Sequence, residues 1–240
     1  MSYSEIIHEI KNRKSTITLN RPSKLNAYTP DMGDEIITAF RESSEDKKVE
    51  IIILRASGKG FCSGADREFL ENKKLSKQGI RLGEDEFITS FVKEISDCPK
   101  PLISCINGIA VGIGVTMILP FDIRIASENA SFSFPFTKLG ILPGLGSSYF
   151  LPALVGASKA KELILTGSSI DAHEACRIGL INKVVSHNEL EESLNRISQE
   201  IINSNQKINS LAKGLFNKEL STDLDLAVQR EREFSKEAIK

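Results

Sequence analysis

Apolar and polar positions along the first half of the chain alternate between two patterns. Continuous apolar or β-branched runs, bounded by turn residues, predict strands that are buried on both faces. Apolar residues at helical spacing predict helices at 30–46 and 87–98, where Pro99 ends the second helix, and a buried helix at 112–119. The strands predicted in this way cover 15–20, 49–57, 101–107, 122–127 and 130–134.

The second half of the chain has mainly helical patterns. A serine N-cap and a terminal glycine bound a helix at 158–167, and an aspartate cap and a terminal glycine bound another at 171–179. A last short strand follows at 181–186. Three amphipathic or charged helices complete the chain, at 188–204, 208–220 and 222–240. The pattern predicts an α/β core over 1–187 and a helical C-terminal region over 188–240.

Composition and charge exclude several classes of function. The 240 residues are 40% hydrophobic and 26% charged, which is ordinary for a globular protein. The net charge of −1 argues against a nucleic-acid binder, and no apolar run is long enough to span a bilayer. Four cysteines without paired spacing and three scattered histidines argue against a metal site and indicate reduced thiols. We therefore expect a cytoplasmic protein with no metal, nucleic-acid or membrane partner.

Two junctions of strand, glycine loop and helix, at 58–70 and 106–119, are candidates for chemistry. Each places free backbone N–H groups at a helix N-terminus. Two such groups aimed at one point form an oxyanion hole. Glycines at such turns are also common in any α/β protein, so neither junction alone indicates more than fold. The dinucleotide-binding, P-loop and serine-hydrolase motifs are all incomplete.

Four stretches together resemble the crotonase (enoyl-CoA hydratase/isomerase) family, in order and with its spacing. They are NRPSKLNAYT, GKGFCSGAD, the run from PKPLISCINGIAVGIG to ILPGLGSS, and ASKAKELILTGSSIDAHEACRIGLINKVV. The resemblance implies a spiral of β-β-α repeats with a helical C-terminal region that makes subunit contacts, assembled as a homotrimer or a dimer of trimers. It also implies an acyl-CoA thioester as ligand, with coenzyme A entering only as part of the substrate and no separate cofactor.

The resemblance implies roles for particular residues. The N–H groups of Ala65 and Ile113 match the two that hold the thioester oxygen as it gains enolate character, although the family usually has glycine at the second position. Three residues match the turn that lines the nucleotide end of CoA: Lys24, Leu25 and Ala27. The loop that grips the pantetheine is matched by Ser63, Gly64 and Asp66. The remaining substrate-binding positions are Gly112, Thr116, Pro135, Phe136, Leu139 and Gly144.

The sequence departs from the family where its catalytic acids stand. Thr116 and Phe136 occupy the two positions at which hydratases carry glutamate. The stretch 135–148 is closest in texture to Δ3,Δ2-enoyl-CoA isomerases, whose single glutamate falls on Gly144. A proton transfer next to a carbonyl requires a base within hydrogen-bond reach. The candidates elsewhere are Tyr149 and four acids after the first junction: Asp66, Glu68, Asp85 and Glu86.

Each of these acids also has a simpler interpretation. An aspartate at position 66 stabilises the start of a helix, and 84–86 is typical of a solvated charge run. Three hypotheses stay open at this point. The first is a hydratase or isomerase with an unidentified base, and the second is an enzyme for a base-free reaction such as decarboxylation. The third is a catalytically silent acyl-CoA binder.

Overall fold

The computed structural model describes residues 3–218 and 221–238. Its larger sheet has six strands in the order β1-β2-β3-β4-β6-β9, in which β1 is antiparallel to β2 and the other neighbours are parallel. A smaller sheet has the order β5-β7-β8. The strands of the larger sheet are β1 (Ile6–Lys11), β2 (Lys14–Leu19), β3 (Ile51–Ala56), β4 (Leu102–Ile106), β6 (Ile123–Ser127) and β9 (Lys183–Val185). Those of the smaller sheet are β5 (Ala110–Val111), β7 (Ser131–Ser133) and β8 (Ser169–Asp171).

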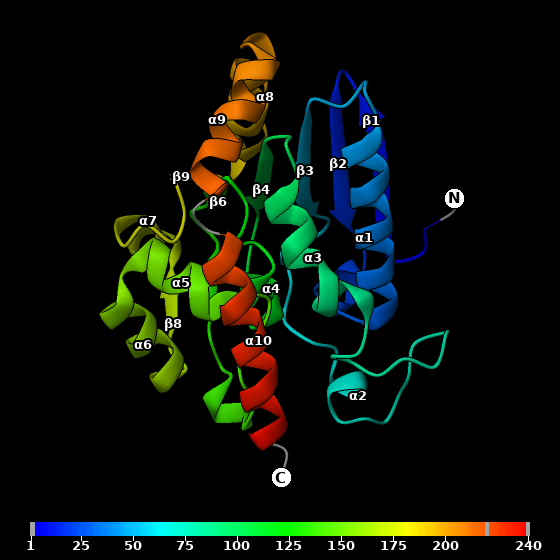
Figure 1. Cartoon of the computed structure of the whole chain (residues 1–240), viewed down its shortest axis with the longest axis vertical. Coiled ribbons are helices and arrows are strands. Elements are labelled where there is room, and N and C mark those ends of the chain that lie inside the picture. The colour runs from blue at the N-terminus through cyan, green and yellow to red at the C-terminus, as the bar shows by residue number, and fades with distance from the viewer. Residues whose placement is uncertain (1–2, 219–220, 239–240) are drawn as a thin grey trace.

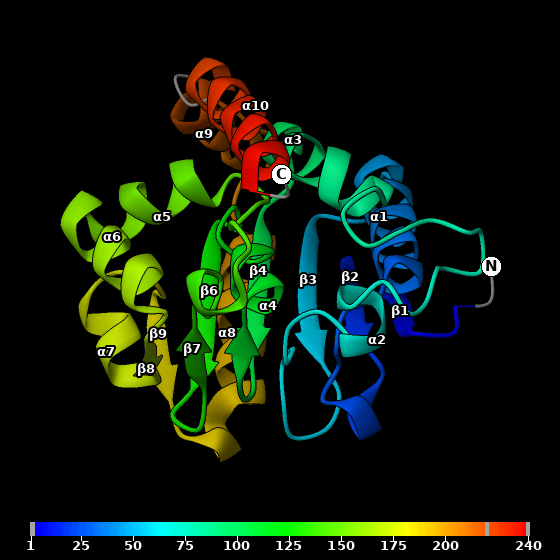
Figure 2. The ribbon, with the colours of Figure 1, turned by 90° about the horizontal axis from the view of Figure 1, so that it is seen from below.

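Helices surround the two sheets (Figure 1). Helices α1, α3, α5, α9 and α10 lie along one side in the view of Figure 2. The opposite face of the larger sheet packs on α8, where Ile51, Ile103 and Ile125 share a core cluster with Leu190 and Leu194. The helices are α1 (Pro30–Glu45), α2 (Arg67–Leu70), α3 (Glu86–Asp97), α4 (Ile113–Thr116), α5 (Ser147–Val155), α6 (Ala157–Thr166), α7 (Ala172–Arg177), α8 (Leu190–Asn203), α9 (Gln206–Lys218) and α10 (Ser221–Ala238).

All five strands predicted in the first half are confirmed, within one or two residues at each end, as β2, β3, β4, β6 and β7. The last predicted strand is confirmed as β9, and the amphipathic helices as α1, α3 and α6 to α10. The predicted ends 219–220 and 239–240 lie outside the described residues. The mixed α/β class with a helical C-terminal region is therefore correct.

Several details of the prediction are wrong. Strand β1 was missed because it is an edge strand with only Ile6 buried, so its sequence shows no apolar run. The helix expected over 112–119 forms only one turn, α4. Helix α6 is preceded by Gly156 as its N-cap rather than by Ser158. Helix α5 and the short strands β5 and β8 were not predicted.

None of the helices in 3–218 and 221–238 combines the length and apolar character needed to cross a bilayer. Within the same residues, no group of three or more histidine, cysteine or acidic side chains is arranged to hold a metal ion.

Candidate active site

Ala65 lies in an extended segment that pairs with Tyr28. The N–H of Tyr28 donates to the carbonyl oxygen of Gly64 at 2.8 Å, and the N–H of Asp66 donates to the carbonyl oxygen of Tyr28 at 2.8 Å. Tyr28 therefore bonds to the peptide groups on both sides of Ala65, in a parallel bridge. Because peptide groups alternate in direction along an extended chain, the N–H of Ala65 points away from Tyr28.

The same segment is held on its other edge by β5. The N–H of Cys62 donates to the carbonyl oxygen of Ile109 at 3.0 Å, and the N–H of Val111 donates to the carbonyl oxygen of Cys62 at 2.9 Å. Helix α4 follows β5 directly and packs against this segment without a gap. A Cβ atom on Gly114 would lie only 2.5 Å from the Cys62 carbonyl oxygen. The beginning of α4 and the segment before Ala65 are therefore in direct contact.

Ile113 is the first residue of α4 and follows Gly112, whose φ of 53° lies in the left-handed region that favours glycine. The N–H groups of Val115 and Thr116 donate to the Gly112 carbonyl oxygen at 2.9 and 3.0 Å, which closes the first turn. The N–H of Ile113 belongs to the N-terminal group that has no partner within a helix. In the described part of the chain, neither this N–H nor that of Ala65 has a hydrogen-bond acceptor.

The turn and the loop expected to bind CoA lie side by side. The N–H of Ser63 donates to the carbonyl oxygen of Leu25 at 3.0 Å, and the Ser63 hydroxyl donates to that of Lys24 at 3.3 Å. Lys24 and Leu25 are exposed, whereas Ala27 is buried next to Tyr28. The structure thus brings together Lys24, Leu25 and Ala27 with Ser63, Gly64 and Asp66.

The three positions that lack an acid differ in their surroundings. Thr116 is 2% exposed, and its hydroxyl donates to the carbonyl oxygen of Ile113 at 3.5 Å. Phe136 is 6% exposed, and its ring lies 3.9 Å from where a Cβ on Gly112 would stand. A Cβ on Gly144 would meet no atom within 4 Å. The first two positions are therefore buried, while the third opens into free space.

Two other residues expected in the acyl pocket lie near Phe136 in the sequence. Pro135 is half-buried, whereas Leu139 is exposed at the end of a single 3₁₀ turn, Thr137–Leu139. The side chain of Leu139 therefore lies outside the protein core.

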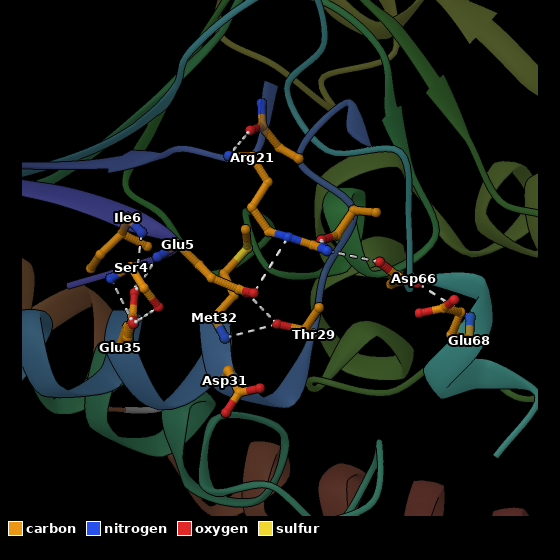
Figure 3. Close-up of polar contacts among 12 residues, drawn as sticks. Ser4, Glu5, Ile6, Arg21, Thr29, Asp31, Met32, Glu35, Asp66 and Glu68 are labelled. Carbon is orange, nitrogen blue, oxygen red and sulfur yellow. Dashed lines mark hydrogen bonds and ion pairs between the residues drawn. The ribbon is translucent and has the colours of Figure 1, made fainter. Parts of the chain in front are cut away.

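Asp66 takes part in a network of ions and hydrogen bonds (Figure 3). Its carboxylate accepts from the N–H of Glu68 at 3.2 Å, which caps α2, and pairs with the Arg21 guanidinium at 3.0 Å. Arg21 also pairs with Glu5 at 3.4 Å. The expectation that Asp66 stabilises a helix start is confirmed, and both of its carboxylate oxygens have partners.

Asp85 does not belong to a solvated charge run, so that interpretation is wrong for this residue. Its side chain is fully buried, accepts from the Tyr28 hydroxyl and from the N–H of Ile88, and thereby caps α3. Burial raises the pKa of its carboxyl group. Glu84 and Glu86 are exposed, as expected, and Glu86 pairs with Arg41.

Two further candidate bases have environments that do not suit the role. Glu68 is exposed, and its Oε2 lies 3.9 Å from Nζ of Lys74. Burial raises the pKa of the Tyr149 hydroxyl above its ordinary value of 10.0, so this group stays protonated at neutral pH.

A carboxylate that the sequence did not reveal lies against the stretch 144–148. Glu231 of α10 accepts from the N–H of Gly146 at 3.0 Å, from the N–H of Ser148 at 2.7 Å and from the Ser147 hydroxyl at 3.4 Å. Burial raises the pKa of its carboxyl group. Glu231 thus caps α5 from a helix far away in sequence. The sequence feature that could have indicated this contact is the spacing between Leu224 and Glu231, which places both residues on one face of α10.

A cavity of about 470 Å³ lies between α3 and α10. Its apolar lining includes Val92, Leu145 and Leu224, and charged residues such as Lys93 and Arg232 form part of its border. Leu145 directly follows Gly144, but neither Ala65 nor Ile113 lines the cavity. The candidate site is therefore located by the two backbone N–H groups and not by this cavity.

Comparison with known proteins identifies the family. The family model described as "Enoyl-CoA hydratase/isomerase" matches residues 9–240. The crotonyl-CoA hydratase of Syntrophomonas wolfei is 38% identical, over 96% of this chain and 88% of its own length. The 1,2-epoxyphenylacetyl-CoA isomerase of Escherichia coli is 28% identical, over 96% and 88%. The relative named as a hydratase is thus more similar over the whole chain than the one named as an isomerase, despite the isomerase-like texture of 135–148.

Solved structures support the same assignment. The enoyl-CoA hydratase of Bacillus halodurans has a TM-score of 0.89 and 30% identity, covering 99% of this chain and 96% of its own. An enoyl-CoA hydratase/isomerase of Pseudoalteromonas atlantica has a TM-score of 0.89 and 28% identity, covering 98% and 92%. The fold is therefore the crotonase fold, and the chain belongs to the enoyl-CoA hydratase/isomerase family.

Proposed function

We propose that this enzyme acts on acyl-CoA thioesters by holding the thioester oxygen in an oxyanion hole formed by the N–H groups of Ala65 and Ile113. One observation carries the proposal: among residues 3–218 and 221–238 neither N–H group has an acceptor, and the segments that bear them are in contact through Cys62 and Gly114. Preorganised donors of this kind stabilise negative charge that develops in the transition state. The charge in question is that of a thioester enolate.

The acyl-CoA assignment has support at the other end of the ligand. The exposed turn with Lys24 and Leu25 lies beside Ser63, as a site for the CoA nucleotide and pantetheine requires. Relatives of this chain are named for crotonyl-CoA and short-chain-enoyl-CoA hydration and for isomerisation of an epoxyphenylacetyl-CoA. Coenzyme A would be part of the substrate, and we propose no separate cofactor.

The reaction we propose first is of the hydratase or isomerase type that the family name describes. Its base would lie outside positions 116, 136 and 144. A second candidate is decarboxylation of an acyl-CoA whose carboxylate is β to the thioester carbonyl. The bond between the α-carbon and the carboxylate breaks, and CO₂ leaves. The electron pair of that bond forms the thioester enolate, and a proton from solvent adds to the α-carbon to complete the product. The burial of Thr116 and Phe136, neither of which is an acid, supports this base-free reaction.

Turnover of three thioesters tests these proposals. Crotonyl-CoA reports hydration, a 3-enoyl-CoA reports double-bond migration, and methylmalonyl-CoA reports decarboxylation. We expect turnover of at least one of them. Ala65→Pro, which removes one N–H donor, should then lower kcat by about 10²–10³-fold. It should still bind S-butyl-CoA, a thioether without the carbonyl. Full turnover by the Ala65→Pro variant would contradict the role of Ala65.

We also propose a homotrimer, or a dimer of trimers, with region 188–240 at the subunit contacts. Helix α9 supports this, because four large apolar side chains on it are more than half exposed: Ile208, Leu211, Leu215 and Phe216. Sedimentation velocity of the protein, compared with a Leu215→Lys, Phe216→Lys variant, tests the proposal. A wild-type monomer would contradict it.

A cytoplasmic location is a further proposal. It is supported by the four cysteines, which are all free in the structure. Two relatives carry the words mitochondrial and peroxisomal in their names, so the family occurs in several compartments.

A further inference from the structure

We propose that Arg21 is a positioning residue for the oxyanion hole. Its guanidinium would set the register between the two chain segments whose pairing directs the N–H of Ala65. This inference rests on the proposed function, because it concerns the same hole. The guanidinium of Arg21 contacts Ala27, Asp66 and Glu5 rather than Ala65 or Ile113, so its action is through other residues.

The guanidinium of Arg21 contacts three different acceptors, of which Glu5 and Asp66 are labelled in Figure 3. One terminal nitrogen donates to Asp66 Oδ2 at 3.0 Å, and the other donates to the carbonyl oxygen of Ala27. The remaining nitrogen, Nε, lies 3.4 Å from Glu5 Oε1. The Arg21 side chain is 16% exposed and that of Asp66 only 9%. Water therefore screens this ion pair less than it would screen a pair on the surface.

The positions of these acceptors give Arg21 its proposed role. Asp66 directly follows Ala65, and Ala27 directly precedes Tyr28. Tyr28 is the residue whose N–H and carbonyl oxygen bond on both sides of Ala65. Arg21 therefore binds, on each of the two paired segments, the residue next to the Tyr28–Ala65 bridge. One planar guanidinium group thus holds both segments relative to each other.

Glu5 and the backbone of Arg21 hold the guanidinium in place. Glu5 also accepts a hydrogen bond from the Thr29 hydroxyl, and Thr29 caps α1. The N–H of Arg21 donates to the Asn26 side chain at 2.8 Å. Both contacts restrict the direction of the Arg21 side chain, because they anchor it at the start and at the end.

Arginine is suited to this position in a way that lysine is not. The planar guanidinium offers five donors in a fixed fork, so it can contact acceptors in several directions at once. A lysine would keep the charge but would present a single ammonium group to acceptors that the guanidinium reaches with three separate nitrogens. Arg21→Lys should therefore keep the charge balance of the network but lose the fixed alignment between the two segments that pair at Tyr28 and Ala65.

The test uses Arg21→Lys and Asp66→Asn, with Arg67→Gln as the matched control. Arg67 is the next residue after Asp66, its side chain is 89% exposed, and it pairs with Glu71 outside the network. Amide hydrogen exchange at Tyr28 and Asp66 reports the pairing directly. The thioester that the wild-type enzyme turns over serves as substrate for steady-state kinetics. The kcat and KM from this assay report how well the oxyanion hole functions.

We expect faster exchange at both amides in Arg21→Lys and Asp66→Asn, with kcat lowered on the order of tenfold. The KM should change less than kcat, because the donor is displaced while the ligand still binds. Arg67→Gln should match the wild type in exchange and in kcat. Unchanged exchange in Arg21→Lys would overturn the inference, and so would faster exchange with an unchanged kcat.

The design separates this inference from the proposed function. If the wild-type protein binds S-butyl-CoA as tightly as crotonyl-CoA, the carbonyl is not recognised and the proposed hole is wrong. The exchange at Tyr28 and Asp66 would still show whether Arg21 fixes the two segments. If the wild type prefers the thioester and Arg21→Lys keeps the wild-type kcat, the hole stands and the role of Arg21 is overturned.

Discussion

Gly114→Ala tests the contact that brings the two proposed N–H donors together. A Cβ at this position would lie 2.5 Å from the Cys62 carbonyl oxygen, 2.8 Å from Cys62 Cβ and 3.1 Å from Cys62 Sγ. Ordinary van der Waals contact begins at 3.4 Å. Helix α4 and the segment 61–66, which contains Cys62 and Ala65, must therefore separate by about 0.9 Å at this point. Two of the three nearest atoms are a carbonyl oxygen and a Cβ, which cannot turn aside as the end of a flexible side chain can.

The expected cost has two parts. Overpacking of a well-packed core destabilises a protein by about 1–3 kcal/mol. A displacement of about 1 Å at a catalytic group lowers the rate by up to about 10²-fold. We therefore expect Gly114→Ala to lower the free energy of unfolding by about 1–3 kcal/mol. We expect the same substitution to lower kcat by about one to two orders of magnitude. Urea denaturation and the thioester assay measure the two effects.

Gly214→Ala is the matched control for this substitution. Gly214 lies in α9, is exposed, and a Cβ there would meet no atom within 4 Å. Replacing a glycine inside a helix by alanine should stabilise the protein by up to about 1 kcal/mol without affecting kcat. If Gly114→Ala behaves like this control, the close packing of α4 on Cys62 is wrong, and so is the placement of the two donors.

Two further predictions concern carboxylates that cap helices. Glu231→Gln should destabilise the protein by about 1–3 kcal/mol in urea denaturation, because the new NH₂ group faces backbone N–H donors at the start of α5. Glu237→Gln on the exposed face of α10 should have no effect, and equal stability of the two variants would refute the cap. Burial raises the pKa of Asp85 in the folded protein. The protonated side chain is therefore favoured by folding, and its contribution to stability is fully present below the ordinary pKa of 3.8. This contribution is lost as the pH rises through the raised pKa. The unfolding free energy of the wild type, relative to Asp85→Asn, should therefore fall as the pH rises above 3.8, and a difference independent of pH would contradict the shift.

The sequence predicted the fold wherever one segment alone carried the signal. Strands β3 and β4 are buried on both faces, so their apolar runs are unmistakable. Strand β1 has Ile6 as its only buried residue, and α5 begins in a run of glycine and serine. Neither has a local pattern that distinguishes it from a loop, because each depends on neighbours far away in the chain.

The candidate site divides in the same way. Glycines at the two junctions indicated Ala65 and Ile113 as candidate donors. The contact between Cys62 and Gly114, which joins the two junctions, is not local in the sequence. Asp85 and Glu231 lie in charged stretches, where a buried carboxylate looks the same as a solvated one. Their burial depends on partners 57 and 83 to 85 residues away, the Tyr28 hydroxyl and the start of α5. Sequence patterns alone therefore could not identify them as caps.

The central claim is that two backbone N–H groups recognise a thioester oxygen, and one pair of titrations tests it most directly. Isothermal calorimetry with crotonyl-CoA and with S-butyl-CoA compares two ligands of the same length that differ mainly at the thioester carbonyl and the double bond. Two hydrogen bonds, each worth about 0.5–1.5 kcal/mol, predict that the thioester binds at least about fivefold more tightly. Equal affinities would contradict the oxyanion hole of Ala65 and Ile113.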